Sequence, residues 1–515
     1  MEKKIRIGWG KRSIAKEGPV PITGQFYLRI SQGVFTPVLV SALAIENGSD
    51  AVIFVSADMV IVQPEMLAKA REILSTEAAD IPCDKIIVNA THTHAGPSSN
   101  AISKDYPNPL EVTSYDEMIS FLGRQLADAV KEAWENRSPG SIAYGYGFAT
   151  TGHSRRTVYL DDIGVRLGGH PGLAVNGHVQ MYGNTCDDMF DGYESGTDPF
   201  INLLYTFDAN EKLTGAVINV PCPSQTNEGA WVLHASFWHN VREKLAAKYG
   251  DIGVIAQASG AGDLSPRQLH YRAAEKRRYE LKYASLLAEY KKHPMATPMP
   301  RTISDDDPGF VNEWMDFLRA EDIANRITAA FDEVLSWAGE DKQSAPSLKH
   351  EVRTVKLARR MFPPEMAEEE KRNLENFMAE AYLSEGDDYA VLQTNSILSC
   401  RRARCRGVIT RAALQEKEPE ITTVIHAVRI GNIAFASNRF ELYMDYMHRI
   451  QARSPFEQTF VIQLVCDLYG SGSYLATAEG IANKGYSASP YCNLVSPEGG
   501  QQLVNETLDM LNEIK

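Results

Sequence analysis

Two histidines separated by one residue are the strongest chemical signal in this chain. His92 and His94 belong to a Thr-His-Thr-His stretch that runs into Ala-Gly-Pro. The apolar, β-branched segment 86–90 before them predicts a buried strand, and the Gly-Pro after them predicts a turn. Residues at i and i+2 of a strand project from the same face, so two neutral imidazoles here suit a zinc site. The structural alternative is a pair of hydrogen-bonded core histidines.

The stretch Thr-His-Thr-His-Ala-Gly-Pro resembles the Thr-His-Thr-His-Ser-Gly-Pro signature of the neutral/alkaline, non-lysosomal ceramidase family of zinc amidases. Four further segments occur in the same order as in that family: residues 152–159, 218–225, 260–266 and 440–486. The resemblance runs from Ile5 to about Leu511. It implies a divergent member, with one large catalytic domain over 1–515 and central β-sheets covered by helices. The family's C-terminal immunoglobulin-like domain is expected to be absent, since fewer than thirty residues follow Tyr486.

The resemblance implies zinc (Zn2+) as cofactor and assigns it four ligands. His92 matches the first histidine ligand, and Glu441 and Tyr474 match the family's glutamate and tyrosine ligands. The second histidine ligand falls on Cys222, in a Cys-Pro-Ser-Gln segment. Cysteine binds zinc as a thiolate, so one interpretation is a His/Cys/Glu/Tyr site. In the other interpretation Cys222 is a small buried residue and the metal is weak or absent. If a structure places its sulfur away from a bound metal, we expect a water or His94 in its place.

The same resemblance places three further groups at the reacting centre. His94 is expected to donate a hydrogen bond to the developing oxyanion. Tyr486 lies twelve positions after Tyr474, the separation of the two active-site tyrosines in the family. The site arginine is either Arg155 or Arg156, and we favour Arg155.

Ser265 is the remaining residue that the resemblance assigns to catalysis. It lies in a Gly-Asp-Leu-Ser-Pro-Arg stretch, where nearby glycines allow close backbone approach and Pro266 fixes the turn. Its role as nucleophile or as positioning hydroxyl stays open, and no His or Asp spacing supports a triad. Arg267 stands where the family has asparagine, a change that bears on what the site recognises.

Composition excludes several classes of partner. The chain carries 52 basic and 66 acidic side chains, a net charge of −14, which argues against binding to nucleic acid or to an anionic membrane. The N-terminus shows no apolar secretory segment, and no apolar run is long enough to predict a transmembrane segment. The seven cysteines are scattered without a disulfide-framework spacing, so we expect a cytoplasmic protein.

Hydrophobic periodicity predicts an α/β fold, because strands and helices alternate up to about residue 260. The expected strands cover 38–45, 51–57, 216–220, 254–257, 347–357 and 422–436, and the expected helices cover 114–134, 237–248 and 500–514, with another starting at Pro64. A long, charged helical pattern over about 270–340 predicts an insertion. It is either a solvated hairpin or subunit interface, or a lid over the site.

These features predict a zinc-dependent hydrolase that cleaves an amide by metal-activated attack of water. The resemblance implies a ceramide-like N-acyl substrate, so the expected partner is a small-molecule or lipid-like acyl amide, and a non-ceramide amide or ester is the nearest alternative. From another class, the alternative is a metal-binding scaffold or ligand-binding protein of the same fold without turnover. Cys222 and Arg267 motivate that alternative. A homo-oligomer is compatible with the helical insertion.

Overall fold

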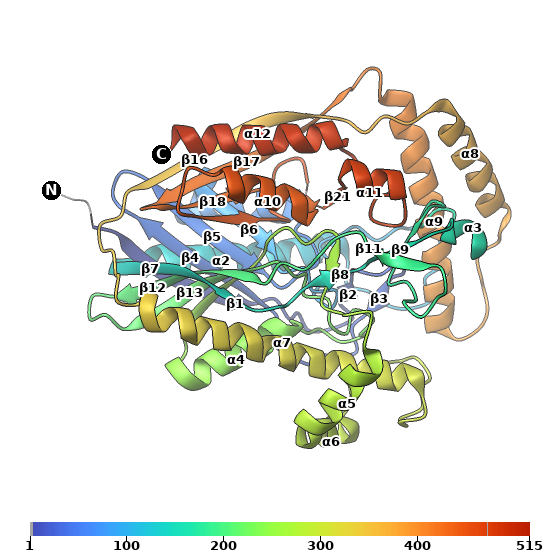
Figure 1. Ribbon diagram of the computed structural model, residues 1–515, viewed down its shortest axis with the longest axis horizontal. Coiled ribbons are helices and arrows are strands. Elements are labelled where there is room, and N and C mark those ends of the chain that lie inside the picture. Colours follow the sequence, from blue (N-terminus) through green and yellow to red (C-terminus); the bar gives the residue numbers. More distant parts are fainter. Residues whose placement is uncertain (1–3, 471) are drawn as a thin grey trace.

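Two β-sheets packed face to face form the centre of the protein (Figure 1). The computed structural model describes residues 4–470 and 472–515. In order across the larger sheet, the strands are β14 (Gly253–Ala258), β13 (Leu213–Val220), β12 (Phe200–Asp208), β7 (Ser138–Phe148), β1 (Arg6–Ser13), β4 (Leu39–Glu46), β5 (Ala51–Ala57) and β6 (Ile86–Ala90). The smaller sheet contains β16 (Leu348–Ala358), β17 (Glu420–Ile430), β18 (Ile433–Ser437) and β20 (Gln458–Ile462). Apolar side chains such as Phe54 and Phe435 fill the space between the sheets.

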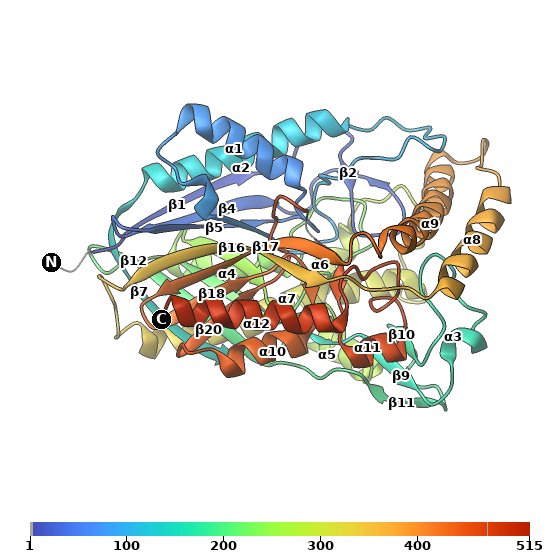
Figure 2. The same ribbon diagram turned by 90° about the horizontal axis from the view of Figure 1, so that it is seen from above.

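Helices cover the outer face of each sheet, which gives four layers (Figures 1 and 2). The larger sheet is covered by α1 (Pro64–Glu77), α2 (Tyr115–Glu135), α4 (Phe237–Tyr249) and α7 (Pro308–Ala338). The smaller sheet is covered by α10 (Met444–Arg453) and α12 (Pro497–Glu513). The predicted α/β class, with central sheets covered by helices, is confirmed.

Local sequence signals explain where several elements begin and end. Ser114 caps α2, and its hydroxyl accepts the N–H of Glu117 at 3.3 Å. Pro64 occupies the first turn of α1. The single strand expected over 422–436 is wrong: the chain forms the hairpin β17–β18, and Gly431 takes a φ of 62° at the turn.

The expected insertion is helical, and it contains α5 (Arg272–Lys282), α6 (Ala284–Lys292) and α7. The first half of α7 packs with α5 and α6 through side chains such as Trp314 and Leu318. Its second half packs on the larger sheet through Ile327 and Phe331. Because α7 belongs to the main core, it is not a separable lid.

The remaining elements are short or lie at one end of the molecule. Two long helices, α8 (Pro364–Ala379) and α9 (Asp388–Leu414), were not expected from the sequence and pack on each other. The short elements are β2 (Pro21–Ile22), β3 (Arg29–Ile30), β8 (His153–Ser154), β9 (Arg156–Tyr159), α3 (Ile163–Arg166), β10 (Val179–Met181), β11 (Phe190–Tyr193), β15 (Leu264–Ser265), β19 (Glu441–Leu442), β21 (Tyr474–Leu475), α11 (Ala478–Asn483) and the 3-10 turn at Cys83–Lys85. Over the described residues, the helices are too short or too polar to cross a membrane.

Candidate functional site

The two histidines lie just beyond β6, which ends at Ala90. His92 has a left-handed φ of 65°, so strand alternation does not bring the rings together as expected; a turn does. The ring centroids are 4.9 Å apart, and the two Nε2 atoms face each other at 3.3 Å. On the far side of its ring, His92 contacts the Val60 carbonyl through Nδ1 at 2.8 Å.

Glu441 and Tyr474 lie side by side because the two-residue strands β19 and β21 pair in parallel, with these residues in register. Glu441 Oε2 is 3.4 Å from His92 Nε2, and Tyr474 is close enough to the same carboxylate to help lower its pKa. Burial acts to raise the pKa of Glu441, but His92 and Arg155 outweigh it and the pKa is lowered. Burial also raises the pKa of Tyr474 well above its usual value, so the pair is a carboxylate beside a neutral phenol.

The two arginines considered for the site have different surroundings. The Arg155 guanidinium lies 5.1 Å from the centroid of the Tyr474 ring and donates to the Gly262 carbonyl at 2.7 Å. Arg156 points to Glu194 instead, with an Nη2–Oε2 distance of 2.8 Å. Arg155 is therefore the arginine that the fold places beside the predicted ligands.

Tyr486 stands at the edge of this cluster. Its ring is 5.7 Å from the Tyr474 ring and 5.3 Å from the Phe26 ring, edge to face in both cases. Burial raises its pKa, so its hydroxyl stays protonated and can donate. Tyr486 and Phe26 also line a cavity of about 180 Å³ whose other walls are mostly apolar.

Ser265 is fully buried at the end of β15, which pairs with β8. Its hydroxyl accepts the backbone N–H of Arg267 at 3.0 Å and lies 3.5 Å from the carbonyl of the same residue. Among the described residues, no histidine or carboxylate hydrogen-bonds this hydroxyl to act as a base. The geometry therefore gives Ser265 a role in holding its turn.

Cys222 lies apart from the predicted ligands, in the apolar cluster between the larger sheet and α4. Its sulfur donates to the Thr151 carbonyl at 3.2 Å and lies 3.4 Å from the Pro223 carbonyl. Burial raises the pKa of the thiol, which favours the neutral form over a thiolate. Gln225, three residues further on, does reach the cluster: its Nε2 is 2.6 Å from His94 Nε2. The structure thus does not bring Cys222 together with His92, Glu441 and Tyr474.

The donors around His92 have the chemistry that zinc takes, namely imidazole, carboxylate and phenol oxygen. His92 contacts both His94 and Glu441, and Tyr474 joins through Glu441. However, within residues 4–470 and 472–515 no three His, Cys, Asp or Glu side chains are spaced to hold a metal ion. A metal bound here needs a small rearrangement of these side chains, or the Tyr474 oxygen as an additional donor.

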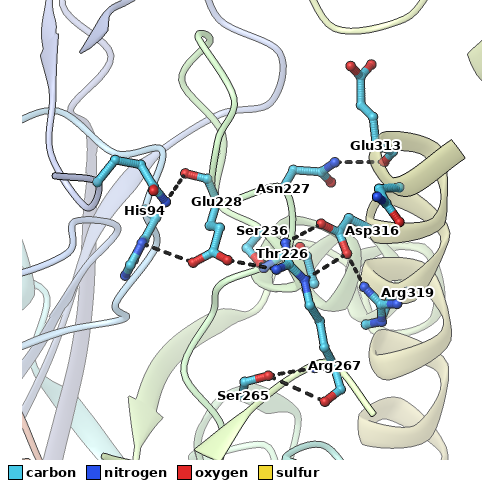
Figure 3. Close-up of polar contacts among 12 residues, drawn as sticks. His94, Thr226, Asn227, Glu228, Ser236, Ser265, Arg267, Glu313, Asp316 and Arg319 are labelled. Carbon is cyan, nitrogen blue, oxygen red and sulfur yellow. Dashed lines mark hydrogen bonds and ion pairs between the residues drawn. The ribbon is translucent and has the colours of Figure 1, made fainter. Parts of the chain in front are cut away.

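Glu228 is a charged residue of the site that the sequence did not single out (Figure 3). Its Oε2 lies 3.6 Å from His94 Nδ1, and its Oε1 lies 2.9 Å from Arg267 Nη1. Arg267 also binds Asp316 of α7, with an Nη2–Oδ2 distance of 2.7 Å. Arg267, the residue that replaces asparagine, therefore connects the histidines to the helical insertion.

Arg29 is the other residue that the sequence did not single out. It is fully buried, and its guanidinium donates to the backbone carbonyls of His94, Glu228, Ala230 and Thr23. Burial lowers its pKa to about 10, which still leaves it charged at neutral pH. An arginine next to Leu28 and Ile30 is the one hint in the sequence that a buried charge lies here.

Comparison with known proteins bears on the fold. A scan of protein-family models finds no match to the sequence, and a search of curated proteins finds none either. Among solved structures, neutral ceramidase from Pseudomonas aeruginosa matches with a TM-score of 0.62 at 15% identity, covering 99% of this chain and 74% of that one. A ceramidase complexed with C2 matches with a TM-score of 0.61 at 14% identity, covering 99% of this chain and 75% of that one. At this identity the likeness shows that the chain has the fold of these ceramidases.

Proposed function

We propose that this chain is a zinc-dependent hydrolase that cleaves the amide bond of an N-acyl substrate. The observation that carries the proposal is the convergence of His92, Glu441 and Tyr474, drawn from distant parts of the sequence, on a fold shared with ceramidases. His92, Glu441 and Tyr474 would hold the metal. Bound zinc would supply a water of lowered pKa and a Lewis acid for the amide carbonyl.

The chain's own side chains would stabilise the charge that develops on the carbonyl oxygen. Burial opposes the charge of Arg155, but Tyr474, Tyr182 and Glu441 outweigh it and raise its pKa, so it stays a cation. The Tyr486 hydroxyl stays a neutral donor. Preorganised donors of this kind act strongly in a buried site, because no water competes with them and no reorganisation is needed.

The surroundings of Tyr486 favour a substrate with an apolar acyl group. The adjoining cavity of about 180 Å³ is lined by Phe26, Leu167, Leu173 and Met181 among others. Burial of methylene groups there contributes about 0.8 kcal/mol each. We therefore expect an N-acyl amide with a short or medium chain to be cleaved at least as well as a long-chain ceramide.

A panel of N-acyl amides and matching esters, from acetyl to palmitoyl, tests this function together with the metal content of the purified protein. We expect bound zinc and hydrolysis of the amides, and Glu441→Gln should lower both, the rate by more than about 100-fold because a ligand is lost. Glu457→Gln is the control, since Glu457 bonds Tyr144 and Asn432 outside the site. Absence of hydrolysis across the panel by zinc-loaded protein would refute the hydrolase.

A second candidate is a ligand-binding protein of this fold without turnover. It is favoured by the lack of a preassembled three-residue metal cluster in the described chain and by the position of Ser265, whose hydroxyl is engaged with Arg267. This candidate predicts tight binding of an N-acyl amide that can be recovered uncleaved. Calorimetric titration followed by mass spectrometry of the released compound separates it from the hydrolase.

A further inference from the structure

A second cavity borders the candidate site, and its walls are rich in positive charge. It measures about 760 Å³, and Tyr182, Arg267, Arg272 and Arg319 line it together with small and polar residues. Neither aspartate nor glutamate is among the described residues that line it. A cavity with arginines and no carboxylate in its walls favours an occupant that carries an anionic group.

Tyr182 connects this cationic cavity to the candidate site. Its backbone N–H donates to the Arg155 carbonyl at 2.9 Å, and its ring centroid lies 5.3 Å from the Arg267 guanidinium. One continuous stretch of chain forms a wall of two cavities, because residues 179–181 line the apolar cavity described above and residues 182–186 line the cationic one. An amide bond held beside Arg155 would therefore extend one substituent toward an apolar wall and the other toward a cationic wall.

Arg267 is held in place by two carboxylates and still has donors left for a ligand. Its Nη1 lies 2.9 Å from Glu228 Oε1, while Asp316 accepts from Nη2 at 2.7 Å and from Nε at 3.3 Å (Figure 3). A guanidinium has five N–H groups, so these three contacts leave two. Neither carboxylate is among the described residues that line the cavity, so a bound anion would meet the arginine rather than its partners.

Arg272 adds a positive charge that has no acidic partner in the described part of the chain. It is the first residue of α5 and is exposed, and its guanidinium contacts the Asn312 side-chain oxygen at 3.4 Å. Arginine binds carboxylates through two parallel N–H groups, a geometry that a hydroxyl cannot match. The cavity therefore suits a carboxylate better than the uncharged hydroxyl groups of a ceramide-like amine.

We propose that the amine half of the substrate carries a carboxylate, which makes the substrate an N-acyl amino acid. The inference rests on the proposed function for cleavage of the amide. The acyl group would lie in the apolar cavity beside Tyr486, and the carboxylate would bind Arg267 and Arg272. Water would add across the C–N bond, its oxygen going to the acyl carbon and a proton to the amine nitrogen. The products would be a carboxylic acid and a free amino acid.

N-octanoylglycine and N-octanoylglycinamide test the inference, because they share the acyl group and the amide and differ in the charge of the amine half. We expect kcat/KM to favour N-octanoylglycine by about 10- to 100-fold, the effect of a charge-assisted hydrogen bond. Arg267→Asn should abolish this preference, because the cation is lost and the carboxylates of Glu228 and Asp316 would repel the substrate. Arg267→Lys should keep part of it. Arg272→Gln should lower the preference about threefold, since exposed charges contribute less.

Arg278→Gln is the matched control. Arg278 is also an exposed arginine of α5, but it pairs with Asp322 and is not among the described residues that line the cavity. It should leave the preference unchanged. Because the preference is a ratio of two rates on one sample, partial loss of folded protein in a variant does not alter it.

Calorimetric titration with the same two compounds separates this inference from the proposed function. If neither compound is cleaved but N-octanoylglycine binds at least about tenfold more tightly, the hydrolase fails and the carboxylate site stands. Equal cleavage and equal binding of the two compounds by the wild type would overturn the inference. An unchanged preference in Arg267→Asn would overturn it as well.

Discussion

Replacing Arg29 with methionine should destabilise the protein and disorder the candidate site together. The guanidinium is fully buried and donates to four carbonyls from three separate segments, at distances from 2.5 to 3.0 Å. Methionine fills a similar volume but offers no donor. Each carbonyl is then buried without its partner, and the His94 and Glu228 backbones lose their common anchor.

The expected cost follows from these contacts. Leaving one buried polar group unsatisfied costs about 1–3 kcal/mol, and losing one partner of a buried charged network costs about 3–5 kcal/mol in total, because some groups relax toward water. Unfolding entropy of about 2.1 cal/mol/K per residue over 515 residues gives about 1.1 kcal/mol/K. A loss of about 4 kcal/mol therefore lowers Tm by about 4 °C if the chain unfolds cooperatively.

Differential scanning calorimetry and zinc titration are the measurements for Arg29→Met. Arg29→Lys should lie between the wild type and Arg29→Met, since an ammonium has three donors for four carbonyls. Arg6→Met is the control, because Arg6 is exposed; its guanidinium donates to the Arg137 carbonyl and lies 3.9 Å from Glu46 Oε2. If Arg29→Met keeps the wild-type Tm and zinc affinity, Arg29 does not organise the site.

Three further predictions concern other parts of the chain. Cys222→Ser should leave the zinc content unchanged and lower the stability by about 1–3 kcal/mol, because it buries a hydroxyl in an apolar cluster. Loss of zinc in this variant would show that Cys222 is a ligand after all. Arg155→Gln should lower kcat about 10²- to 10³-fold on a cleaved amide and leave KM nearly unchanged. If KM rises by as much as kcat falls, Arg155 does not act only in the transition state. Burial lowers the pKa of His350 to about 3 and that of His426 well below 6.5. The stability that this neutral pair contributes is therefore complete above pH 6.5 and is lost as the pH falls toward 3. The free energy of unfolding in urea should fall between pH 7 and pH 4 by about 3 kcal/mol more in the wild type than in His350→Gln.

The fold was predictable where periodicity and caps are strong. The apolar runs at β4, β5 and β14 and the cap at Ser114 placed their elements within a few residues. The hairpin at Gly431 was missed because strand-like sequence continues on both sides of the short turn Gly431-Asn432. Helices α8 and α9 were missed because they pack mainly on each other rather than on a sheet.

The sequence placed His92, Glu441 and Tyr474 in one candidate site, and the structure brings these three together, but their geometry could not be predicted. The neighbouring positions of Glu441 and Tyr474 depend on two strands of two residues each, which carry no periodic signal. Glu228 was missed because it is held near His94 by contacts with Arg29 and Arg267, which come from distant segments. Sequence motifs list the groups that can react, whereas buried charges from elsewhere in the chain fix where those groups lie.

The residues just before Cys222 already indicated that its side chain is buried in the core. Ala216, Ile218 and Val220 alternate along β13 and share one apolar cluster, and Cys222 continues the same parity and joins the same cluster. Gln225 lies in the loop after β13, and its amide lies 2.6 Å from His94 Nε2. Alternation along a buried strand therefore argues that Cys222 faces the core, even though alignment to a family motif places it at a ligand. Where these two arguments disagree, the packing of the side chain decides, because a thiol that is buried in this apolar cluster and donates to the Thr151 carbonyl is not directed at the ligands beside His92.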